Sequence, residues 1–300
     1  MKNNKDGIRL SREDKILNGI VYFFMILLLI ILCYPLIYVL SSSFSSGQAV
    51  SSGKVLLWPV DFSTTGYKIV FNYKLIWTGY KNTLIITFVG TLLNLSLTIL
   101  AAYPLSRKDF KGGKFYMTLF LIVMFFSGGI IPTYILMSNL HLTDSLWSIV
   151  LGNAISVYNM IIMRTFFRNS IPYELFEAAR IDGVSDIGYL FKIVLPLSKS
   201  IIAVITLYYA VAHWNAYFNA MLYIRDRKLY PLQLVLRDIL NASQVDLSQI
   251  QDAEVLAQMI GSADLIKFSL IVVSTVPILV AYPFVQRFFE KGVMIGSVKG

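Results

Sequence analysis

Long stretches of the chain contain no charged side chain, and their lengths are the first indication of its structure. Six windows lack Asp, Glu, Lys and Arg altogether: 16–53, 82–106, 115–143, 145–163, 200–224 and 268–286. A helix that crosses a lipid bilayer needs about 20 mostly apolar residues. Helices satisfy their backbone hydrogen bonds internally, whereas open sheet edges in lipid do not. The pattern therefore predicts an all-α integral membrane protein with six transmembrane helices.

The same windows set the expected boundaries along the chain. They predict an N-terminal segment 1–15, a first span 16–44, a loop 45–77, a core 78–289 with the remaining five spans, and a tail 290–300. The first apolar run is far longer than the roughly 7–15 residues of a cleavable signal peptide, so we expect a retained anchor. The segment Ser127–Pro132 is expected to break the third span, because glycine and proline interrupt helices.

Composition and charge narrow the class and give an orientation. The chain is 56% hydrophobic and 14% charged, which is unlike a disordered chain or an ordinary soluble domain. The formal charge of +9 does not form a basic stripe with interleaved aromatic residues, so we expect no nucleic-acid partner. The two termini and the loops after the second and fourth windows hold 17 of the 26 Lys and Arg. By the positive-inside rule, both termini are expected in the cytoplasm.

Several kinds of chemistry have no counterpart in the sequence. The sequence contains no Gly-x-x-x-x-Gly-Lys-Ser/Thr loop, no His-Glu-x-x-His pair and no Cys/His ligand cluster. No charged residue lies near the middle of a predicted span, where coupled transporters and proton relays usually carry one. We therefore expect a non-catalytic chain that binds no metal or cofactor of its own. If it transports a solute actively, a partner must supply the energy.

The longest predicted cytoplasmic loop carries the most specific pattern. Ser170 and Pro172 are helix-start signals, and Asp182-Gly183 is typical of a helix stop. A second helical stretch is expected from Asp186 to Leu195, ending at Pro196. The small residues at 178 and 179 would let another surface approach closely. The alternative is an ordinary amphipathic connector, but that alternative does not account for the spacing.

Glu-Ala-Ala at 177–179, Gly183, Ile193 and Leu195-Pro196 together resemble the EAA loop of binding-protein-dependent ABC importer permeases. The tail after Glu290, Trp214-Asn215 and the segment 230–233 resemble the maltose-transporter type of that family. The segments 127–134 and 259–261 are similar to the branch that serves complex oligosaccharides and polysaccharide fragments.

The resemblance implies a type I ABC importer permease in a bacterial cytoplasmic membrane. Such a chain forms half of a pore that a second, homologous permease subunit completes. Two ATPase subunits hold ATP and magnesium, and an extracytoplasmic sugar-binding protein delivers the cargo. The loop 223–264 is expected to contact that binding protein.

By the same resemblance, two sets of residues would contact the ATPase subunits. The coupling set docks on one ATPase subunit, and it comprises Glu177, Ala178, Ala179, Asp182, Gly183, Ile193, Leu195 and Pro196. The tail set reaches between the ATPase subunits, and it comprises Lys291, Gly292, Gly296 and Lys299.

Candidates for the sugar path are aromatic and amide side chains near the fourth and fifth spans. They are Tyr208, Trp214, Asn215, Tyr217, Phe218, Asn219, Asn153 and Tyr158. Sugar sites combine aromatic faces with hydrogen-bonding groups, but each residue also has a structural reading as a helix–helix contact or an interface aromatic. Two rival functions stay open at this point: an ABC permease for a non-sugar solute such as an amino acid, a peptide or phosphate, and a non-ABC channel or membrane enzyme.

Overall fold

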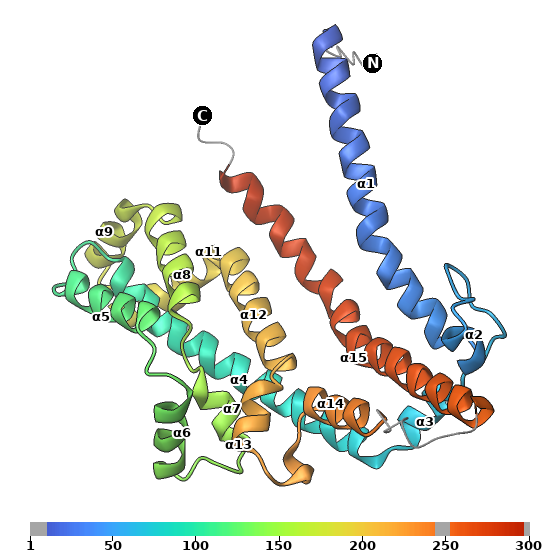
Figure 1. Ribbon diagram of the computed structural model, residues 1–300. Helices are drawn as coiled ribbons and strands as arrows, with labels where there is room; N and C mark the ends of the chain where they lie inside the picture. The colour runs from blue at the N-terminus through green and yellow to red at the C-terminus, as the bar shows by residue number, and fades with distance from the viewer. Residues whose placement is uncertain (1–10, 244–252, 297–300) are drawn as a thin grey trace. The chain divides into compact units, whose positions relative to one another are not determined.

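The computed structural model describes residues 11–243 and 253–296, and every regular element among them is helical (Figure 1). This agrees with the predicted all-α class. The chain divides into two compact units, residues 1–70 with 243–272 and residues 71–242 with 273–300. Each unit is described by itself below.

The first unit begins with one long apolar helix. Helix α1 (Arg12–Ser43) starts at a capping box, in which Ser11 Oγ accepts from the Asp14 amide and Asp14 Oδ2 accepts from the Ser11 amide. Its large apolar side chains from Ile16 to Leu32 are exposed, as a helix that faces lipid requires. The helix ends at Ser43, one residue before the end of the expected first span 16–44.

Short serine side chains organise the chain directly after α1. Ser41 Oγ donates to the carbonyl of Leu57 at 2.6 Å, and Ser43 Oγ lies 2.7 Å from the hydroxyl of Tyr67. Helices α2 (Gly47–Ser51) and α3 (Thr65–Asn72) follow, so the predicted loop 45–77 contains helical turns. The N-terminal part of α15 (Ala253–Gly296) packs on α2 through an apolar cluster that includes Val50, Leu265 and Phe268.

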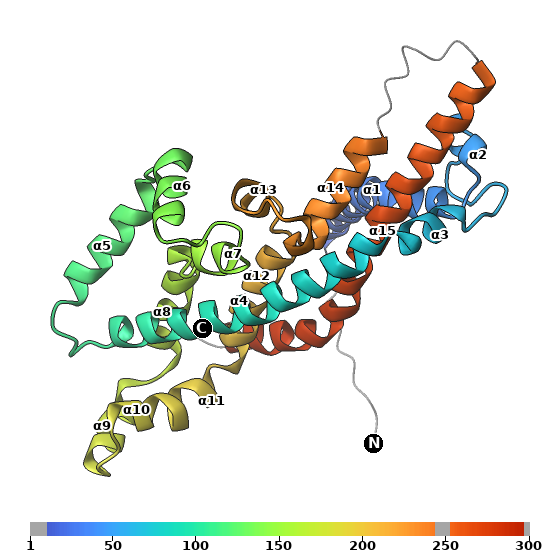
Figure 2. The same ribbon diagram turned by 90° about the horizontal axis from the view of Figure 1, so that it is seen from below.

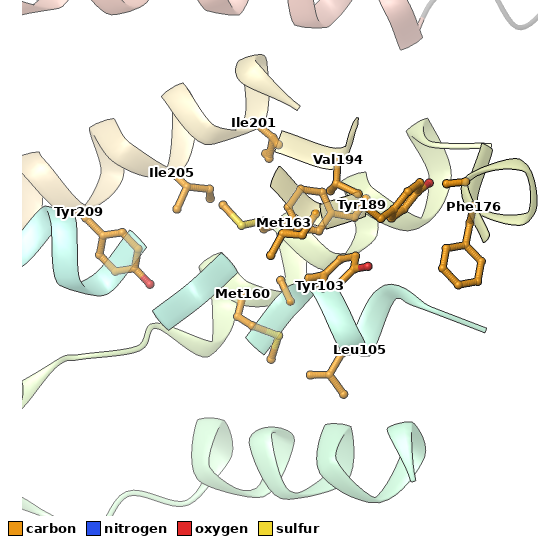
Figure 3. Close-up of a cluster of buried hydrophobic side chains, with 14 residues drawn as sticks. Tyr103, Leu105, Met160, Met163, Phe176, Tyr189, Val194, Ile201, Ile205 and Tyr209 are labelled. Atoms are coloured by element: carbon orange, nitrogen blue, oxygen red, sulfur yellow. The ribbon is translucent and has the colours of Figure 1, made fainter. Parts of the chain in front are cut away.

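The second unit is built on α4 (Lys74–Ser106), which α8 (Val157–Ser170) and α12 (Lys199–Trp214) flank (Figures 1 and 2). Its main apolar cluster joins these three helices to the segment that follows α8. In Figure 3, Met163, Tyr103 and Tyr189 lie close together at the centre of this cluster, and Phe176 lies at its edge.

A sharp bend separates two consecutive helices of the second unit at a segment that contains glycine residues. Helices α5 (Gly113–Phe125) and α6 (Ile130–Asn139) meet at 112°, with Gly129 at φ +87° between them. A break in the window 115–143 is thereby confirmed, but it lies at 126–129, and Pro132 is inside α6.

Fewer helices are long enough to cross a membrane than the six spans that the sequence predicts. Among the residues that the structure describes, three helices are long and apolar enough to cross a membrane, or five when each bent pair counts as one span. The missing span is window 145–163, which holds two short helices, α7 (Trp147–Gly152) and α8, separated at 153–156. The count of six is therefore not confirmed by the helices.

The remaining helices are short and lie at the ends of the long ones. Helix α9 (Tyr173–Ile181), α10 (Asp186–Tyr189), a π-helical turn (Leu190–Val194) and α11 (Leu195–Leu197) project together from the ends of α8 and α12 (Figure 2). The segment Asp186–Leu197 meets α12 at 84°. Helix α13 (Phe218–Tyr223), a 3-10 turn (Arg227–Leu229) and α14 (Leu232–Ser243) follow α12.

A contact between two glycines in the first unit yields a stability prediction. A Cβ on Gly261 would lie 2.8 Å from the backbone of Gly47, whereas a Cβ on Gly19 of α1 would meet nothing within 4 Å. Gly261→Ala should therefore lower the free energy of unfolding by about 1–3 kcal/mol, because backbone cannot move aside cheaply. Gly19→Ala should raise it by about 0.5–1 kcal/mol through helix propensity. The melting temperatures of the two full-length variants in detergent check this pair, and equal shifts would contradict it.

Candidate functional site

The segment 170–198 forms a compact helical hairpin whose turn depends on one glycine. Helix α9 starts directly after Pro172 and ends at Ile181, as the sequence predicts. Gly183 has φ +73°, its amide donates to the Arg180 carbonyl at 3.1 Å, and the Val184 amide donates to the Ala179 carbonyl at 2.8 Å. This is a Schellman C-cap, in which the left-handed residue is usually glycine.

The second half of the hairpin differs from the prediction at its end. Helix α10 begins at Asp186 as expected, with Ser185 Oγ accepting from the Gly188 amide at 3.1 Å. Pro196 does not end the helical stretch, which continues to Leu197 and breaks at Ser198. A π-helical turn precedes the proline, and such turns interrupt the ordinary hydrogen-bond ladder that proline would otherwise break.

The predicted coupling residues fall on two sides of this hairpin. Ala179 is buried in the main apolar cluster, and Ile193 and Leu195 pack against that cluster. The exposed members are Glu177, Ala178, Asp182, Gly183 and Pro196.

The hairpin also exposes five large apolar side chains that the motif does not include: Leu175, Leu197, Ile181 (87% exposed), Ile187 and Phe191. The spacing of four between the last two was the sequence signal for a shared face. An exposed face of this kind is typical of a surface that binds another protein.

One side chain that sequence reasoning missed ties the hairpin to α4. Arg107, directly after α4, forms ion pairs with Asp109 and Asp186. The hydrogen bonds from Arg107 hold the pKa of the Asp109 carboxyl below its usual range. A cavity of about 570 Å³ beside it is lined by the ends of α4 and α8 and by the start of α9.

A second cavity, of about 460 Å³, lies between α4, α12, α13 and the break between α7 and α8. Six of the eight sugar-path candidates line it: Asn153, Tyr208, Asn215, Tyr217, Phe218 and Asn219. The other lining residues include Asn94, Ser156, Asn159 and His213, and none of those that line it is Asp, Glu, Lys or Arg. Aromatic faces with amides and hydroxyls suit a ligand that is rich in hydrogen-bonding groups.

A buried polar network fixes the wall of this polar cavity. Asn94 Nδ2 donates to the carbonyl of Asn153 at 3.1 Å and lies 3.1 Å from His213 Nε2. The imidazole fits against α4 because residue 90 is glycine, where a Cβ would lie 2.5 Å from His213 Nε2. Tyr209 Oη lies 2.7 Å from Thr98 Oγ1 and accepts from the Ser156 amide at 3.1 Å.

The other two candidates do not line the polar cavity. Trp214 is 6% exposed, and its Nε1–H donates to the carbonyl of Ser274 on α15 at 3.1 Å. Tyr158 is exposed on α8 and is absent from the wall of the cavity.

Of the predicted tail set, Lys291, Gly292 and Gly296 lie on α15. The side chain of Lys291 and the whole of Lys299 lie outside the described residues.

The start of the loop 223–264 is held by one carboxylate. Asp144 Oδ1 accepts from the amides of Arg225 and Asp226, both at 2.9 Å. These two backbone donors lower the pKa of Asp144, because they favour the charged form. The loop then continues into α14, where Leu232, Leu234, Val235 and Leu236 are buried.

Comparison with known proteins assigns the chain to a protein family. Residues 94–295 match the model of the family described as binding-protein-dependent transport system inner membrane components. The chain belongs to this family. It is therefore a component of a transport system and a membrane protein, and the rival reading as a non-ABC channel or membrane enzyme is excluded.

Relatives cover the chain almost completely. It is 40% identical to the polygalacturonan/rhamnogalacturonan transport system permease protein YtcP of Bacillus subtilis, over 96% of this chain and 100% of that protein. It is 27% identical to the arabinooligosaccharides transport system permease protein AraQ of Halalkalibacterium halodurans, over 89% of this chain and 91% of that protein.

A solved structure is similar along most of the chain. This is a chain of a bacterial ABC transporter involved in the import of the acidic polysaccharide alginate, with a TM-score of 0.83 and 34% identity, covering 94% of this chain and 100% of that one. The permease fold of the family is therefore present here.

The position of Trp214 generates a prediction for this inner membrane component. Trp214→Phe removes one buried hydrogen bond to Ser274 and should lower the free energy of unfolding by about 1 kcal/mol. The maximal transport rate should stay within about twofold, because the ring lies outside the polar cavity. Trp58→Phe, at an exposed position, is the control for the melting temperature in detergent. A large loss of transport at unchanged stability would place Trp214 on the substrate path instead.

Proposed function

We propose that this chain is a permease subunit of an ATP-driven, binding-protein-dependent importer of oligosaccharides or larger glycan fragments. The observation that carries the proposal is the full-length similarity, at 40% and 34% identity, to a polygalacturonan/rhamnogalacturonan permease and to a chain of an alginate importer. Both of those cargoes are acidic glycans, so uronate-containing fragments are the first cargo to test. A permease for an amino acid, peptide or phosphate is the alternative that the same test addresses.

In this proposal the chain crosses a bacterial cytoplasmic membrane six times, with both termini in the cytoplasm. The excess of Lys and Arg at the termini and in two loops supports the orientation. The fourth crossing along the chain, which brings the number to six, consists of α7 and α8 together. Irregular backbone between them is tolerable at membrane depth where it lines a polar cavity, and Asn153 and Ser156 line one.

The chain would work as one half of a pore. A second, homologous permease subunit completes the pore, and an extracytoplasmic sugar-binding protein delivers the cargo to the loop 223–264. Two ATPase subunits hold ATP and magnesium, and the tail residues Lys291, Gly292, Gly296 and Lys299 reach between them. The chain itself binds no cofactor and catalyses no reaction.

The hairpin α9–α11 is the proposed docking element for one ATPase subunit. Its exposed residues combine a carboxylate (Glu177), a small side chain (Ala178) and apolar side chains at 181, 187 and 191. Such a mixture suits an interface with an apolar centre and a charged contact. Closure of the ATPase pair on ATP would then bias the permease between inward-facing and outward-facing states.

The polar cavity is the proposed part of the sugar path in this chain. Its walls bear Tyr208, Tyr217 and Phe218 as aromatic faces and Asn153, Asn215 and Asn219 as hydrogen-bonding amides. The guanidinium of Arg237 lies 5.7 Å from the ring centroid of Tyr217, which lines the cavity, so a cation lies next to one of the lining rings. This arrangement fits a sugar that carries both hydroxyls and a carboxylate.

Reconstitution tests the cargo and the path together. The complete complex in proteoliposomes should import oligogalacturonate when ATP and its binding protein are present. Tyr217→Ala should lower the maximal import rate about tenfold, because the loss of one aromatic wall removes roughly 1.4 kcal/mol from the sugar in transit. Affinity of the isolated binding protein is unaffected by the variant, so the maximal rate is the quantity to measure.

Tyr22→Ala, at an exposed position on α1, is the matched control and should import at the wild-type rate. Equal rates for Tyr217→Ala and Tyr22→Ala would remove the cavity from the sugar path. Import of a non-sugar solute in place of any glycan would favour the alternative function.

Gly183 allows a test of the docking surface. A Cβ at this position meets no atom of the chain within 4 Å, but φ is +73°. Leu strains such a turn by about 1–2 kcal/mol, whereas Asn tolerates it. If an ATPase subunit lies close against the turn, Gly183→Leu and Gly183→Asn should both abolish sugar import while the protein remains in the membrane. Import that survives in Gly183→Asn would show that only the turn geometry matters and would contradict close docking.

A further inference from the structure

A single guanidinium lies where α4, α9 and α10 meet. Arg107 follows the last residue of α4, and its side chain is only 14% exposed. Its Nε and Nη2 donate to the two carboxylate oxygens of Asp109, at 2.9 and 2.6 Å. Its Nη1 donates to Asp186 Oδ1 at 2.5 Å and to the hydroxyl of Tyr103 at 3.2 Å.

These contacts differ in what they connect. Asp109 is two residues from Arg107, so that bidentate pair is local and does not join two elements. Asp186 is the first residue of α10, so the pair with Asp186 crosses from α4 to the hairpin. Tyr103 reinforces the crossing, because its hydroxyl also donates to the backbone carbonyl of Asp186 at 3.0 Å.

The same guanidinium also lies over an aromatic ring of α9. Arg107 Cζ lies 3.8 Å from the ring centroid of Phe176, the residue directly before Glu177 on α9. Phe176 is buried and also contacts the ring of Tyr189 edge to face, with centroids 5.3 Å apart. Figure 3 shows the Phe176, Tyr189 and Tyr103 rings at this end of the cluster. One side chain therefore touches both helices of the hairpin and the end of α4.

Apolar packing alone would let the hairpin slide over the end of α4, because such contacts are not directional. A planar guanidinium with several fixed donors sets both distance and orientation. Charge-assisted bonds are roughly twice as strong as neutral ones. Because the Asp186 side chain is 68% exposed and water weakens exposed ion pairs, the bond from Tyr103 to the Asp186 carbonyl and the contact with Phe176 are needed beside the ion pair.

We infer that Arg107 is a positioning residue that makes α4 follow the hairpin, and that the Arg107–Asp186 pair transmits ATPase movement into the membrane helices. This inference rests on the proposed function, in which the hairpin docks on an ATPase subunit.

Helix α4 is the appropriate recipient of that movement. It packs along α8 and α12 and supplies Asn94, which binds the wall of the polar cavity through Asn153. A displacement of the end of α4 therefore reaches the proposed sugar path through one rigid helix.

Two conservative variants separate transmission from local support. Asp186→Asn weakens the pair that crosses elements and leaves the α10 cap intact, because Ser185 provides that cap. Asp109→Asn, the matched control, weakens only the local pair. Each complete complex is reconstituted in proteoliposomes, and oligogalacturonate imported per ATP hydrolysed is measured at equal amounts of assembled complex. Asp186→Asn should lower this ratio about tenfold with ATP hydrolysis retained, and Asp109→Asn should change it by less than about twofold.

Arg107→Lys serves as the second variant, because a single ammonium keeps the charge but cannot hold both carboxylates and cover Phe176. It should lower the same ratio, and it decides the matter if Asp186→Asn fails to assemble. An unchanged ratio in either assembled variant, or equal losses of import and hydrolysis, would overturn the inference. A wild-type complex that hydrolyses ATP without importing any glycan would instead overturn the proposed function.

Discussion

The second unit depends on the hydrogen bonds that four buried polar side chains of one apolar helix form with other elements. Helix α4 buries Asn82, Thr83, Asn94 and Thr98, and each bonds to a distant element. Asn82 donates to the carbonyls of Lys228 and Tyr230, Thr83 Oγ1 accepts from the Leu232 amide, and Thr98 meets Tyr209. Away from water, these polar groups can form hydrogen bonds only with other parts of the protein. The bonds therefore fix the positions along α4 of the segment 227–232, of α12 and of the break between α7 and α8.

Such bonds between distant residues also limit which parts of the fold can be predicted from the sequence. Charge-free windows locate apolar helices well, because the bilayer imposes a length and a composition. They do not reveal breaks within a window. From sequence, residues 153–156 continue the fourth span, but the Asn153 carbonyl and the Ser156 amide bond to Asn94 and Tyr209 from other helices. Partners so distant in sequence leave no local signal.

Side-chain direction set a second limit on prediction from sequence. The motif placed the helix start at Pro172 and the stop at Asp182-Gly183 correctly, since capping is a local property. It could not tell that Ala179 faces the interior while Ala178 faces out. Likewise Trp214 and Asn215 are neighbours in sequence, but only Asn215 lines the polar cavity. From sequence, Arg107 counted only as one of the Lys and Arg residues that indicate the orientation in the membrane, because its partner Asp186 is 79 residues away.

Charge and polarity are divided between the two sites in a way that suits their proposed tasks. Among the described residues, both ion pairs involve Arg107, at the joint between α4 and the hairpin. The polar cavity is instead walled by amides, hydroxyls and rings, which can bind a moving sugar through contacts that are weak enough to exchange. A strong, oriented contact is useful where one element must follow another, and it would trap the cargo if it lined the path. The ion pair at the end of α4 and the absence of Asp, Glu, Lys and Arg from the residues that line the cavity therefore each suit the proposed task of their site.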